Sequence, residues 1–549
     1  MRISVGLVSG SLLLFCAAVC LGQGAIPVGA TQSPDAQCGK LAGLNLPHAT
    51  VTEAEVVGAG EFKSPPGPIL GADASALYKK LPAFCRVVVH SHPTADSDIP
   101  IEVWMPLEGW NGRMLATGNG GFAGSIGFSD LGAAVAKGYA TAGTDTGHEG
   151  AFIDASWALD HPEKVADFGW RGIHEMTVTA KAVVEAFYGD DAKHSYFASC
   201  SDGGREALME AQRFPGDYDG ILAGAPANNW TALLTTAAVD TLALTAKPDS
   251  YIPPAKIPAI AKAVLAECDA LDGVKDGILN DPRKCHFDPA TIECKVGKDS
   301  NDCLTAAQVT ALTVLYAGPH DAKGRAIFPG YLPGAEEGLN GWGTWIFGPA
   351  PGKSLMAMFG QGYFADMVHD DTNWDLKSFK LESGFKEARD KTAAALDAVN
   401  PDLSAFEKHG GRLILYHGWN DPAISALNSV NYYESVVGKM GKAETEGFVR
   451  LYMLPGVQHC GEGPGPDEIG QSWIWPDQDP EHNVRIALED WVEKGIAPST
   501  LIATKTARDQ AEGAAMMTRL LCPYPQSARY KGRGDTNSAE NFFCAGPGK

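Results

Sequence analysis

Strand-like and helical segments alternate along residues 86–228, and this alternation limits the fold more than any other feature. We predict strands at residues 86–90, 99–105, 114–117, 139–145, 194–200 and 220–225, and helices at 175–188 and 204–214. Strands that alternate with helices imply a mostly parallel sheet covered on both faces. The pattern returns with strands at 412–416 and 448–454 and a helix at 484–493. The sequence therefore predicts an α/β fold.

The segment between these two stretches has a different character. Residues 229–405 are richer in loops, aromatic residues and cysteines, and the chain of 549 residues is too long for one compact core. We predict a catalytic core formed by residues 38–228 and 406–549, with a lid domain at 229–405 inserted into it.

The N-terminus has the features of a secretory signal. Met1 and Arg2 precede a mostly apolar run, residues 7–21, and small residues follow up to Ala30. We predict a signal peptide over residues 1–25, with cleavage between Gly22 and Ala30. The apolar run is shorter than the ~20 residues of a spanning helix, so a membrane anchor is the weaker alternative. The mature protein is expected to be secreted or periplasmic, with no membrane association.

The charge balance excludes some partners. Lys and Arg number 44 and Asp and Glu number 66, which gives a formal net charge of −22. A chain this acidic repels polyanions, so neither nucleic acid nor an anionic membrane surface is an expected partner.

Ser201 lies where a predicted strand turns directly into a helix. The sequence there is Ser199-Cys200-Ser201-Asp202-Gly203, close to the G-x-S-x-G pattern of a nucleophile elbow but with Ser in the first place. Small residues suit the tight turn that exposes the serine hydroxyl. The alternative is an ordinary glycine-rich turn between strand and helix.

Two later residues complete the requirements of a serine nucleophile. In this fold the acid follows the nucleophile and the histidine comes last. Asp421 follows the strand 412–416, and His459 follows the strand 448–454. Both therefore lie at the carboxyl edge of the sheet, where parallel α/β folds build their sites. Taken singly, each could also be a loop-capping aspartate or a surface histidine.

Two cysteines support this grouping. Cys200 directly precedes the proposed nucleophile, and Cys460 directly follows the proposed base. A disulfide holds two Cα atoms roughly 4.4–6.8 Å apart. A Cys200–Cys460 bond would therefore hold Ser201 next to His459. Ten cysteines remain after signal removal, so five disulfides are expected in an exported chain.

The intermediate of acyl transfer needs donors for its oxyanion. We predict the backbone N–H of Asp202 as one donor. The other is expected from the segment Gly118–Gly121, with Gly121 favoured and Gly120 next. The alternative for this segment is a flexible turn.

An acidic cluster lies in the predicted lid. Asp269, Asp272 and Asp276 fall close together among glycines, which suits a hard cation bound by oxygen. The backbone carbonyls of Val274 and Ile278 could complete a calcium shell, and a disulfide between Cys268 and Cys285 could close the loop. The alternative is a solvated acidic turn.

Together these motifs resemble the tannase and feruloyl esterase family of α/β-hydrolases. The resemblance rests on Cys200–Gly204, on Asp421 within His417–Asp421, on His459-Cys460, on Gly118–Gly121 and on Asp269–Ile278. It implies an α/β-hydrolase core with a large inserted lid and a structural calcium ion, and no organic cofactor. It also implies the disulfides Cys38–Cys85, Cys268–Cys285, Cys294–Cys303 and Cys522–Cys544.

The resemblance further implies an enzyme that hydrolyses esters of aromatic acids. We expect a feruloyl-type esterase that uses Ser201, His459 and Asp421 through an acyl-enzyme, on small esters that plant polysaccharide or polyphenol can carry. A tannase acting on gallates, or a mono-hydroxyethyl terephthalate hydrolase, is the alternative. A non-catalytic binding protein on the same scaffold is a more distant one. The residues expected around the substrate ring are Trp342, Trp345, Phe359 and Ile424.

Overall fold

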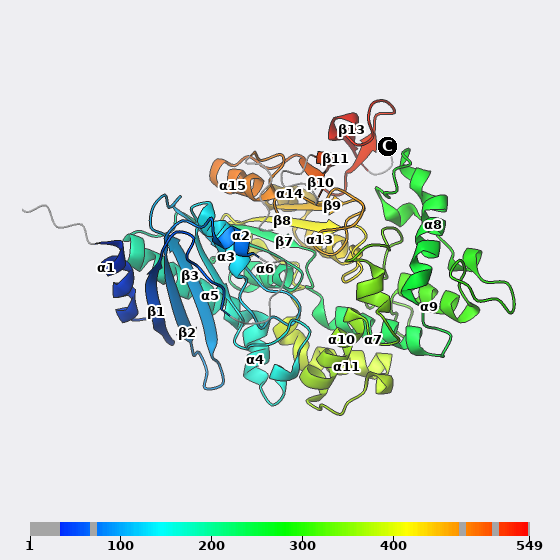
Figure 1. Ribbon diagram of the computed structural model, residues 1–549, viewed down its shortest axis with the longest axis horizontal. Coiled ribbons are helices and arrows are strands. Elements are labelled where there is room, and N and C mark those ends of the chain that lie inside the picture. The colour runs from blue at the N-terminus through cyan, green and yellow to red at the C-terminus, as the bar shows by residue number, and fades with distance from the viewer. Residues whose placement is uncertain (1–32, 66–73, 472–478, 508–514, 547–549) are drawn as a thin grey trace, which may run out of the picture.

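The computed structural model describes residues 33–65, 74–471, 479–507 and 515–546. The predicted signal peptide at residues 1–25 lies outside these residues. Figure 1 shows a central sheet with helices on both of its faces and a group of helices at one side.

One nine-stranded sheet organises the described chain, in the order β1-β2-β3-β5-β4-β6-β7-β8-β9. Strands β4 to β9 are parallel to one another, while β1, β2 and β3 join the edge through antiparallel pairs. The eight predicted strands are all present, as β2 (Phe84–Ser91), β3 (Ile99–Pro106), β4 (Arg113–Ala116), β5 (Ala140–Thr144), β6 (His194–Cys200), β7 (Gly220–Gly224), β8 (Arg412–Gly418) and β9 (Val449–Leu454), and the sheet also contains β1 (Ala49–Val57). The prediction of a mostly parallel α/β sheet is confirmed.

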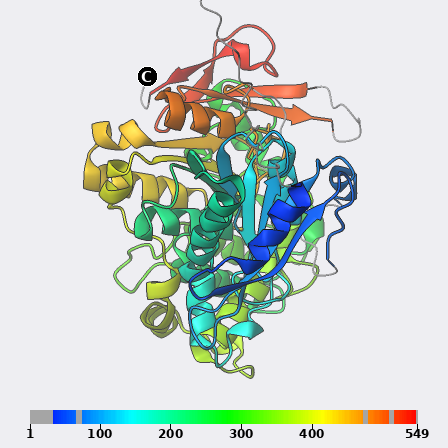
Figure 2. The same cartoon turned by 90° about the vertical axis from the view of Figure 1, so that its left-hand side faces the viewer.

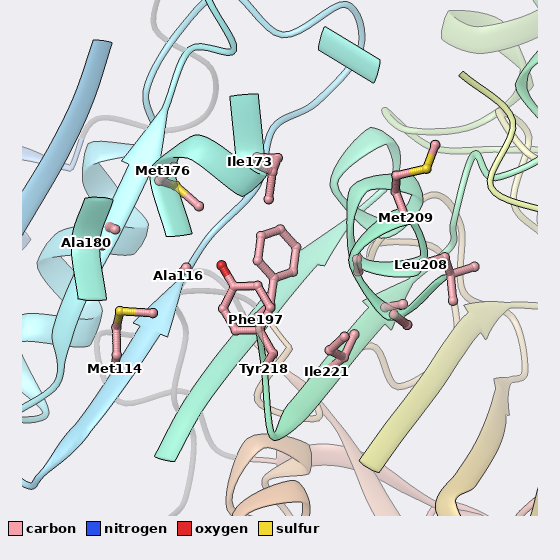
Figure 3. Close-up of a cluster of buried hydrophobic side chains, with 14 of the residues drawn as sticks. Met114, Ala116, Ile173, Met176, Ala180, Phe197, Leu208, Met209, Tyr218 and Ile221 are labelled. Atoms are coloured by element: carbon pink, nitrogen blue, oxygen red, sulfur yellow. The ribbon is translucent and has the colours of Figure 1, made fainter. Parts of the chain in front are cut away.

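Side chains leave the central strands on alternate faces, and each face has its own apolar core. On one face, Met114, Phe197 and Ile221 pack beneath helices α5 (Gly172–Tyr188), α6 (Asp202–Arg213) and α13 (Leu427–Met440), as Figure 3 shows for α5 and α6. On the other face, Leu115 and Leu222 lie beneath α3 (Phe128–Ala136) and α15 (Val484–Lys494). This period-2 division fixes the register of the strands, because a shift by one residue would exchange the two faces.

Residues 225–411, called the inserted segment below, run between the neighbouring strands β7 and β8. They are mostly helical (green to yellow in Figure 1), and they form one apolar cluster of their own and a second one together with core residues such as Phe122 and Phe168. The helices are α7 (Trp230–Thr245), α8 (Ile257–Cys268), α9 (Ala306–Ala317), α10 (Leu355–Gly362), α11 (Leu381–Leu396) and α12 (Ser404–Lys408). Whether residues 229–405 act as a lid stays a prediction.

The ends of the chain hold elements that the sequence did not predict. β1 adds an edge strand beside β2, and its alternately exposed residues, such as Glu53 and Glu55, hide the strand pattern. Two small antiparallel pairs follow α15 and stand above the main sheet (red in Figure 2). They are β10 (Leu501–Thr506) with β11 (Ala515–Leu521), and β12 (Ser527–Tyr530) with β13 (Phe542–Ala545). The remaining helices are α1 (Pro34–Gly39), α2 (Ser75–Tyr78), α4 (Pro162–Ala166) and α14 (Lys442–Phe448).

Five disulfides link the described chain. They are Cys38–Cys85, Cys200–Cys460, Cys268–Cys285, Cys294–Cys303 and Cys522–Cys544, the five expected pairs. None of the helices in the described part of the chain combines the length and apolar character that a membrane-spanning segment requires.

Candidate active site

Ser201 occupies the sharp turn between β6 and α6. Its backbone has φ 68° and ψ −122°, a left-handed conformation that is strained for a residue with a side chain. Such turns require small neighbours. A Cβ atom at Gly203 would lie 1.9 Å from the Ser199 hydroxyl oxygen, so only glycine fits there. The backbone conformation and the crowding are those of a nucleophile elbow.

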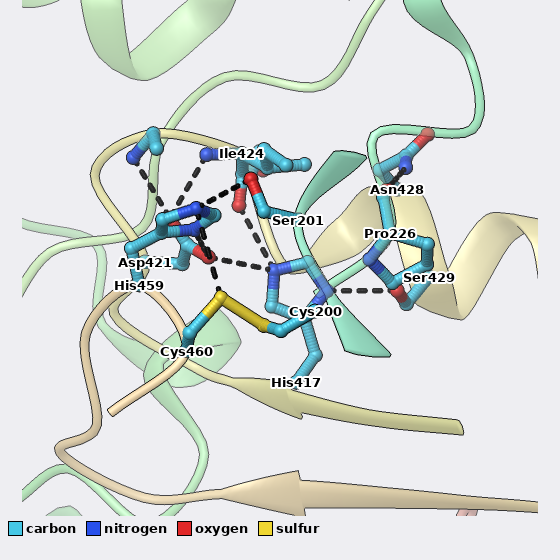
Figure 4. Close-up of polar contacts among 12 residues, drawn as sticks. Cys200, Ser201, Pro226, His417, Asp421, Ile424, Asn428, Ser429, His459 and Cys460 are labelled. Atoms are coloured by element: carbon cyan, nitrogen blue, oxygen red, sulfur yellow. Dashed lines mark hydrogen bonds and ion pairs between the residues drawn. A yellow bond between two sulfur atoms is a disulfide. The ribbon is translucent and has the colours of Figure 1, made fainter. Parts of the chain in front are cut away.

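Asp421 and His459 reach this serine from the loops after β8 and β9. His459 Nε2 lies 2.8 Å from Ser201 Oγ, and His459 Nδ1 lies 2.7 Å from Asp421 Oδ2 (Figure 4). The His459 side chain is 8% exposed and the Asp421 carboxylate is fully buried. The structure thus joins the three predicted residues in one hydrogen-bonded chain.

Several groups hold Asp421 as a carboxylate. Its Oδ1 accepts hydrogen bonds from the backbone N–H groups of Ala423 and Ile424, at 2.8 and 2.9 Å. Burial alone would raise the pKa of Asp421, but His459 and His417 outweigh it and hold the pKa well below its usual value. The acid is therefore ionised and oriented toward His459 Nδ1.

His417 is a second histidine on this carboxylate, and the sequence analysis missed its role. It is buried, and its Nε2 lies 3.2 Å from Asp421 Oδ2 and 3.0 Å from the carbonyl oxygen of Ile424. Both partners can only accept, so Nε2 carries a hydrogen and donates it. Nδ1 lies 2.7 Å from Ser429 Oγ. The signal was present in the sequence, because His417 lies four residues before Asp421.

The disulfide Cys200–Cys460 lies directly beneath the serine and the histidine (Figure 4). Its Cα atoms are 6.0 Å apart, although 260 residues separate the two cysteines in the chain. It fixes the end of β6 to the loop after β9, and so restricts the distance between the nucleophile and the base.

The glycine loop, residues 118–121, faces Ser201 from the end of β4. Gly121 has φ +61°, and a Cβ atom there would lie 2.2 Å from the carbonyl oxygen of Phe152. Among the described residues, no acceptor is bound to the backbone N–H of Gly121 or of Asp202. Both predicted oxyanion donors are therefore available at the site.

Two hydrogen bonds attach the glycine loop to α6. Gly203 N donates to the carbonyl oxygen of Asn119 at 2.8 Å, and Asn119 N donates to Glu206 Oε2 at 2.9 Å. Glu206 is 1% exposed, and burial, followed by the charge of Asp202, raises its pKa to about 8. Its carboxyl group also excludes any side chain at Gly118, where a Cβ atom would lie 2.1 Å from Oε2. Helix α6 thus carries both the nucleophile's turn and the anchor of the loop.

The α6 helix contains a further buried pair at its start. Arg205 Nε donates to Asp202 Oδ1 at 2.5 Å, and its other nitrogens donate to the carbonyl oxygens of Phe168 and Gly169. The guanidinium also lies over the Phe168 ring, 4.6 Å from its centroid. Burial is the largest influence on Asp202 and raises its pKa despite Arg205. The pair fixes the Asp202 side chain away from the oxyanion site.

The inserted segment contacts both the acid and the base loops. Asn340 Nδ2 donates to the carbonyl oxygen of His459 at 2.8 Å, and Gln458 Nε2 donates to that of Ala335 at 2.7 Å. Asn420 Nδ2 donates to the carbonyl oxygen of Pro333 at 2.9 Å. Residues 333–340 therefore help to position Asp421 and His459.

Ser201 opens into a cavity of about 1730 Å³. The glycine loop, Phe152, Trp345 and His459 line it near the serine, and residues 60–65 and 125–130 line it farther away. The Trp345 ring meets the His459 ring edge-on at 4.9 Å, and its indole N–H donates to Asn340 Oδ1. The cavity has room for an aromatic ring beside the serine.

The other three residues expected around the substrate ring do not line this cavity. Trp342 is 1% exposed and packs with Tyr316 and Phe347 in the core of the inserted segment. Phe359 lies behind Trp345, with parallel rings 6.4 Å apart, and Ile424 joins the same apolar cluster as Phe359. Aromatic composition does not distinguish rings that face a cavity from rings that fill a core, and contact of these three residues with the substrate stays a prediction.

The acidic loop, residues 269–278, has the oxygen donors of a calcium site, but its carboxylates lie far apart. Asp269, Asp272 and Asp276 each accept a hydrogen bond from a backbone N–H of the loop, at 3.0 to 3.1 Å. Asp276 Oδ2 also pairs with Arg519 at 2.6 Å. Among the described residues, the three carboxylates do not gather within 4.8 Å of one another. The buried Val274 and Ile278 lie in the same loop, which the Cys268–Cys285 disulfide closes.

Known proteins are similar to this chain in sequence and in fold. The family described as "Tannase and feruloyl esterase" matches residues 85–545. An uncharacterized esterase of Xanthomonas campestris is 40% identical over 94% of this chain and 92% of its own length. A probable feruloyl esterase B-1 of Aspergillus fumigatus is 33% identical over 87% of this chain and 88% of its own.

The solved structures agree. The crystal structure of feruloyl esterase B from Aspergillus oryzae matches with a TM-score of 0.84 and 30% identity, over 93% of this chain and all of that one. The expected α/β-hydrolase fold, the resemblance and the class of carboxylic ester hydrolase are thereby confirmed. The chain belongs to the tannase and feruloyl esterase family.

Proposed function

We propose that this protein is an exported serine esterase that releases aromatic acids of the hydroxycinnamate type from their esters through Ser201, His459 and Asp421. The observation that carries the proposal is the hydrogen-bonded chain from Ser201 Oγ through His459 to the buried Asp421 carboxylate. Relatives of this chain are named feruloyl esterases, and this supports hydroxycinnamate esters as its substrates. Ester hydrolysis on gallates is the second candidate, since the family name includes tannase.

In the first half of the reaction, Ser201 Oγ attacks the ester carbonyl while His459 Nε2 takes its proton. Asp421 holds the hydrogen on Nδ1, so Nε2 faces the serine with its lone pair. The protonated His459 then gives the proton to the leaving alcohol, and an acyl-enzyme forms. In the second half, His459 takes a proton from water, the water oxygen attacks the acyl carbon, and the acid is released as Ser201 regains its proton.

The negative charge on the carbonyl oxygen is stabilised by the N–H groups of Gly121 and Asp202. Loss of one such donor in other hydrolases costs roughly 3–4 kcal/mol of transition-state stabilisation. Asp202 N–H is also at the start of α6, where the helix dipole favours negative charge. The aromatic ring of the acid is placed against Trp345, with Phe359 and Ile424 supporting that wall from behind.

The partner of the enzyme is a small aromatic ester, which plant polysaccharide or polyphenol carries in our proposal. The five disulfides support folding in an oxidising compartment, and hence export. This agrees with the signal peptide expected at residues 1–25.

The first prediction concerns the substrate class. We expect initial hydrolysis rates on methyl ferulate to exceed those on methyl gallate, mono-hydroxyethyl terephthalate and an aliphatic p-nitrophenyl ester. Ser201→Ala should abolish hydrolysis of all four, because it removes the hydroxyl that forms the proposed acyl-enzyme. A preference for the aliphatic ester would refute the aromatic-acid assignment, and full activity of the variant would refute the serine mechanism.

A second prediction tests the disulfide beneath the site. Replacement of both Cys200 and Cys460 by Ala should lower kcat strongly while KM changes little, because the bond fixes the nucleophile relative to the base and not the substrate pocket. Cys294→Ala with Cys303→Ala is the matched control, since that disulfide lies in the inserted segment away from Ser201. Equal kcat values in both double variants would contradict the role of the Cys200–Cys460 bond.

A third prediction tests Glu206 as the anchor of the glycine loop. Glu206→Ala removes the acceptor of Asn119 N–H, so the Gly121 donor should shift and kcat should fall about tenfold to a hundredfold. Glu206→Gln should retain most of kcat at pH 7, because the amide reproduces the neutral carboxyl that a pKa of about 8 favours there. Above pH 8 the wild type gains a charge facing Asp202 and Arg205, and its pH profile should depart from that of Glu206→Gln. Identical losses in both variants would argue against this anchor.

We further propose that the acidic loop holds a structural calcium ion through Asp269, Asp272, Asp276 and the carbonyls of Val274 and Ile278. Carboxylate and carbonyl oxygens are the donors that calcium prefers. The ion would stabilise the loop and take no part in the hydrolysis. The competing arrangement is the one in which Arg519 alone balances the charge of Asp276.

The fourth prediction separates these two arrangements. A calcium chelator should lower the melting temperature of the wild type, and added calcium should restore it. Asp272→Ala should melt at the lower temperature and ignore both treatments. An unchanged melting temperature of the wild type in chelator would favour the Arg519 pair and refute the calcium site.

A further inference from the structure

His174, Glu210 and Asp217 converge on the helical side of the sheet, away from Ser201. His174 lies on α5, Glu210 near the end of α6, and Asp217 in the turn that leads to β7. One nitrogen of His174 and one carboxylate oxygen from each acid all lie within 4.8 Å of one another. Two nitrogen or oxygen ligands of one tetrahedral zinc ion lie about 3.3 Å apart, so side-chain adjustments would bring all three onto one ion.

Glu210 is the observation that points to a ligand. The residue is 1% exposed, and neither oxygen of its carboxylate has a hydrogen-bond partner among the described residues. Buried carboxylates without partners are costly, and Asp217 adds a second negative charge beside this one. No described group therefore neutralises the Glu210 carboxylate through a direct hydrogen bond.

The neighbouring groups make their hydrogen bonds elsewhere. The charge of Lys181 on α5 acts on Glu210, but its ammonium group donates to the backbone carbonyl of Asp217 and not to either carboxylate. The Tyr218 hydroxyl bonds to Thr177. His174 Nδ1 lies 2.7 Å from Asp217 Oδ2, so its imidazole meets one acid only.

A metal ion can reach the site from solvent, and the types of ligand present limit which metal it could bind. The side chains of His174 and Asp217 are 28% and 16% exposed, so an ion can reach them from solvent. The Phe214 ring stacks on the His174 ring at 3.7 Å and 8°, which fixes the plane of the imidazole. One imidazole with two carboxylates suits a first-row transition metal better than calcium or magnesium, which prefer oxygen alone.

We propose that His174, Glu210 and Asp217 form a binding site for a divalent transition metal ion of the zinc type. The ion would link α5, the end of α6 and the turn before β7. It would lie at the end of α6 that is farther from Ser201. It would stabilise the core and has no place in the hydrolysis, so the proposal stands apart from the proposed function.

Zinc binding to the whole protein tests this site. Metal-free protein is titrated with Zn²⁺ in excess Ca²⁺, so that the acidic loop is saturated, and the bound zinc and the melting temperature are measured. We expect one bound zinc ion and a melting temperature raised by a few degrees at saturation. Co²⁺ should give the visible absorption of a protein-bound ion. Glu210→Gln should lose all three responses, whereas Glu185→Gln, an exposed change on α5, should keep them.

Three outcomes would overturn the site. If zinc leaves the wild type unchanged and Glu210→Gln is more stable than the wild type, the two acids share a proton and need no metal. If Glu210→Gln binds zinc as the wild type does, the ion lies elsewhere. Should Glu210→Gln fail to fold, His174→Gln replaces it, because its side chain is partly exposed, and retained zinc binding in that variant would also refute the proposal.

Discussion

The covalent bond between Cys200 and Cys460 is the constraint on which the site depends most. Ser201 and His459 come from strands β6 and β9, with β7 and β8 between them in the sheet. A hydrogen bond of 2.8 Å between their side chains tolerates little movement of either loop. The disulfide connects the end of β6 to the loop after β9, and it therefore resists unfolding of that loop. The strained turn at Ser201 can persist because both of its sides are tied to rigid elements.

Helix α6 carries more of the site than its position suggests. Its first turn provides the Asp202 N–H, and Glu206 holds the glycine loop through Asn119. Arg205 is surrounded by Asp202, two carbonyl oxygens and an aromatic ring, so no water is needed to solvate it. This buried polar group orients the helix relative to residues 168–169. The segment from Asp202 to Glu210 is fully buried although four of its residues are ionisable, and Asp202, Arg205 and Glu206 are each placed against a backbone group or a charged partner.

The sequence analysis grouped three residues that the structure joins by hydrogen bonds, and their catalytic role stays a proposal. Ser201 could be recognised from its flanking small residues, and Asp421 and His459 from their places after predicted strands. Glu206 was missed because its role arises from a contact that no local pattern records. The bond from Asn119 to Glu206 joins residues 87 positions apart. Trp342 and Trp345 illustrate the same limit, since they differ by three residues and only the fold decides which one lines the cavity. The edge strand β1 escaped because half of its side chains face solvent.

The contacts of the inserted segment have a consequence for the way this fold can diversify. Pro333, Ala335 and Asn340 bond to residues beside Asp421 and His459, so this part of the insertion belongs to the active-site framework. Trp345, in contrast, presents its ring to the cavity a few residues later. Transfer of a complete insertion from a relative would therefore change substrate selectivity and triad alignment together. An exchange that begins after Asn340 would keep these three bonds, and it would vary Trp345 together with the rest of the insertion.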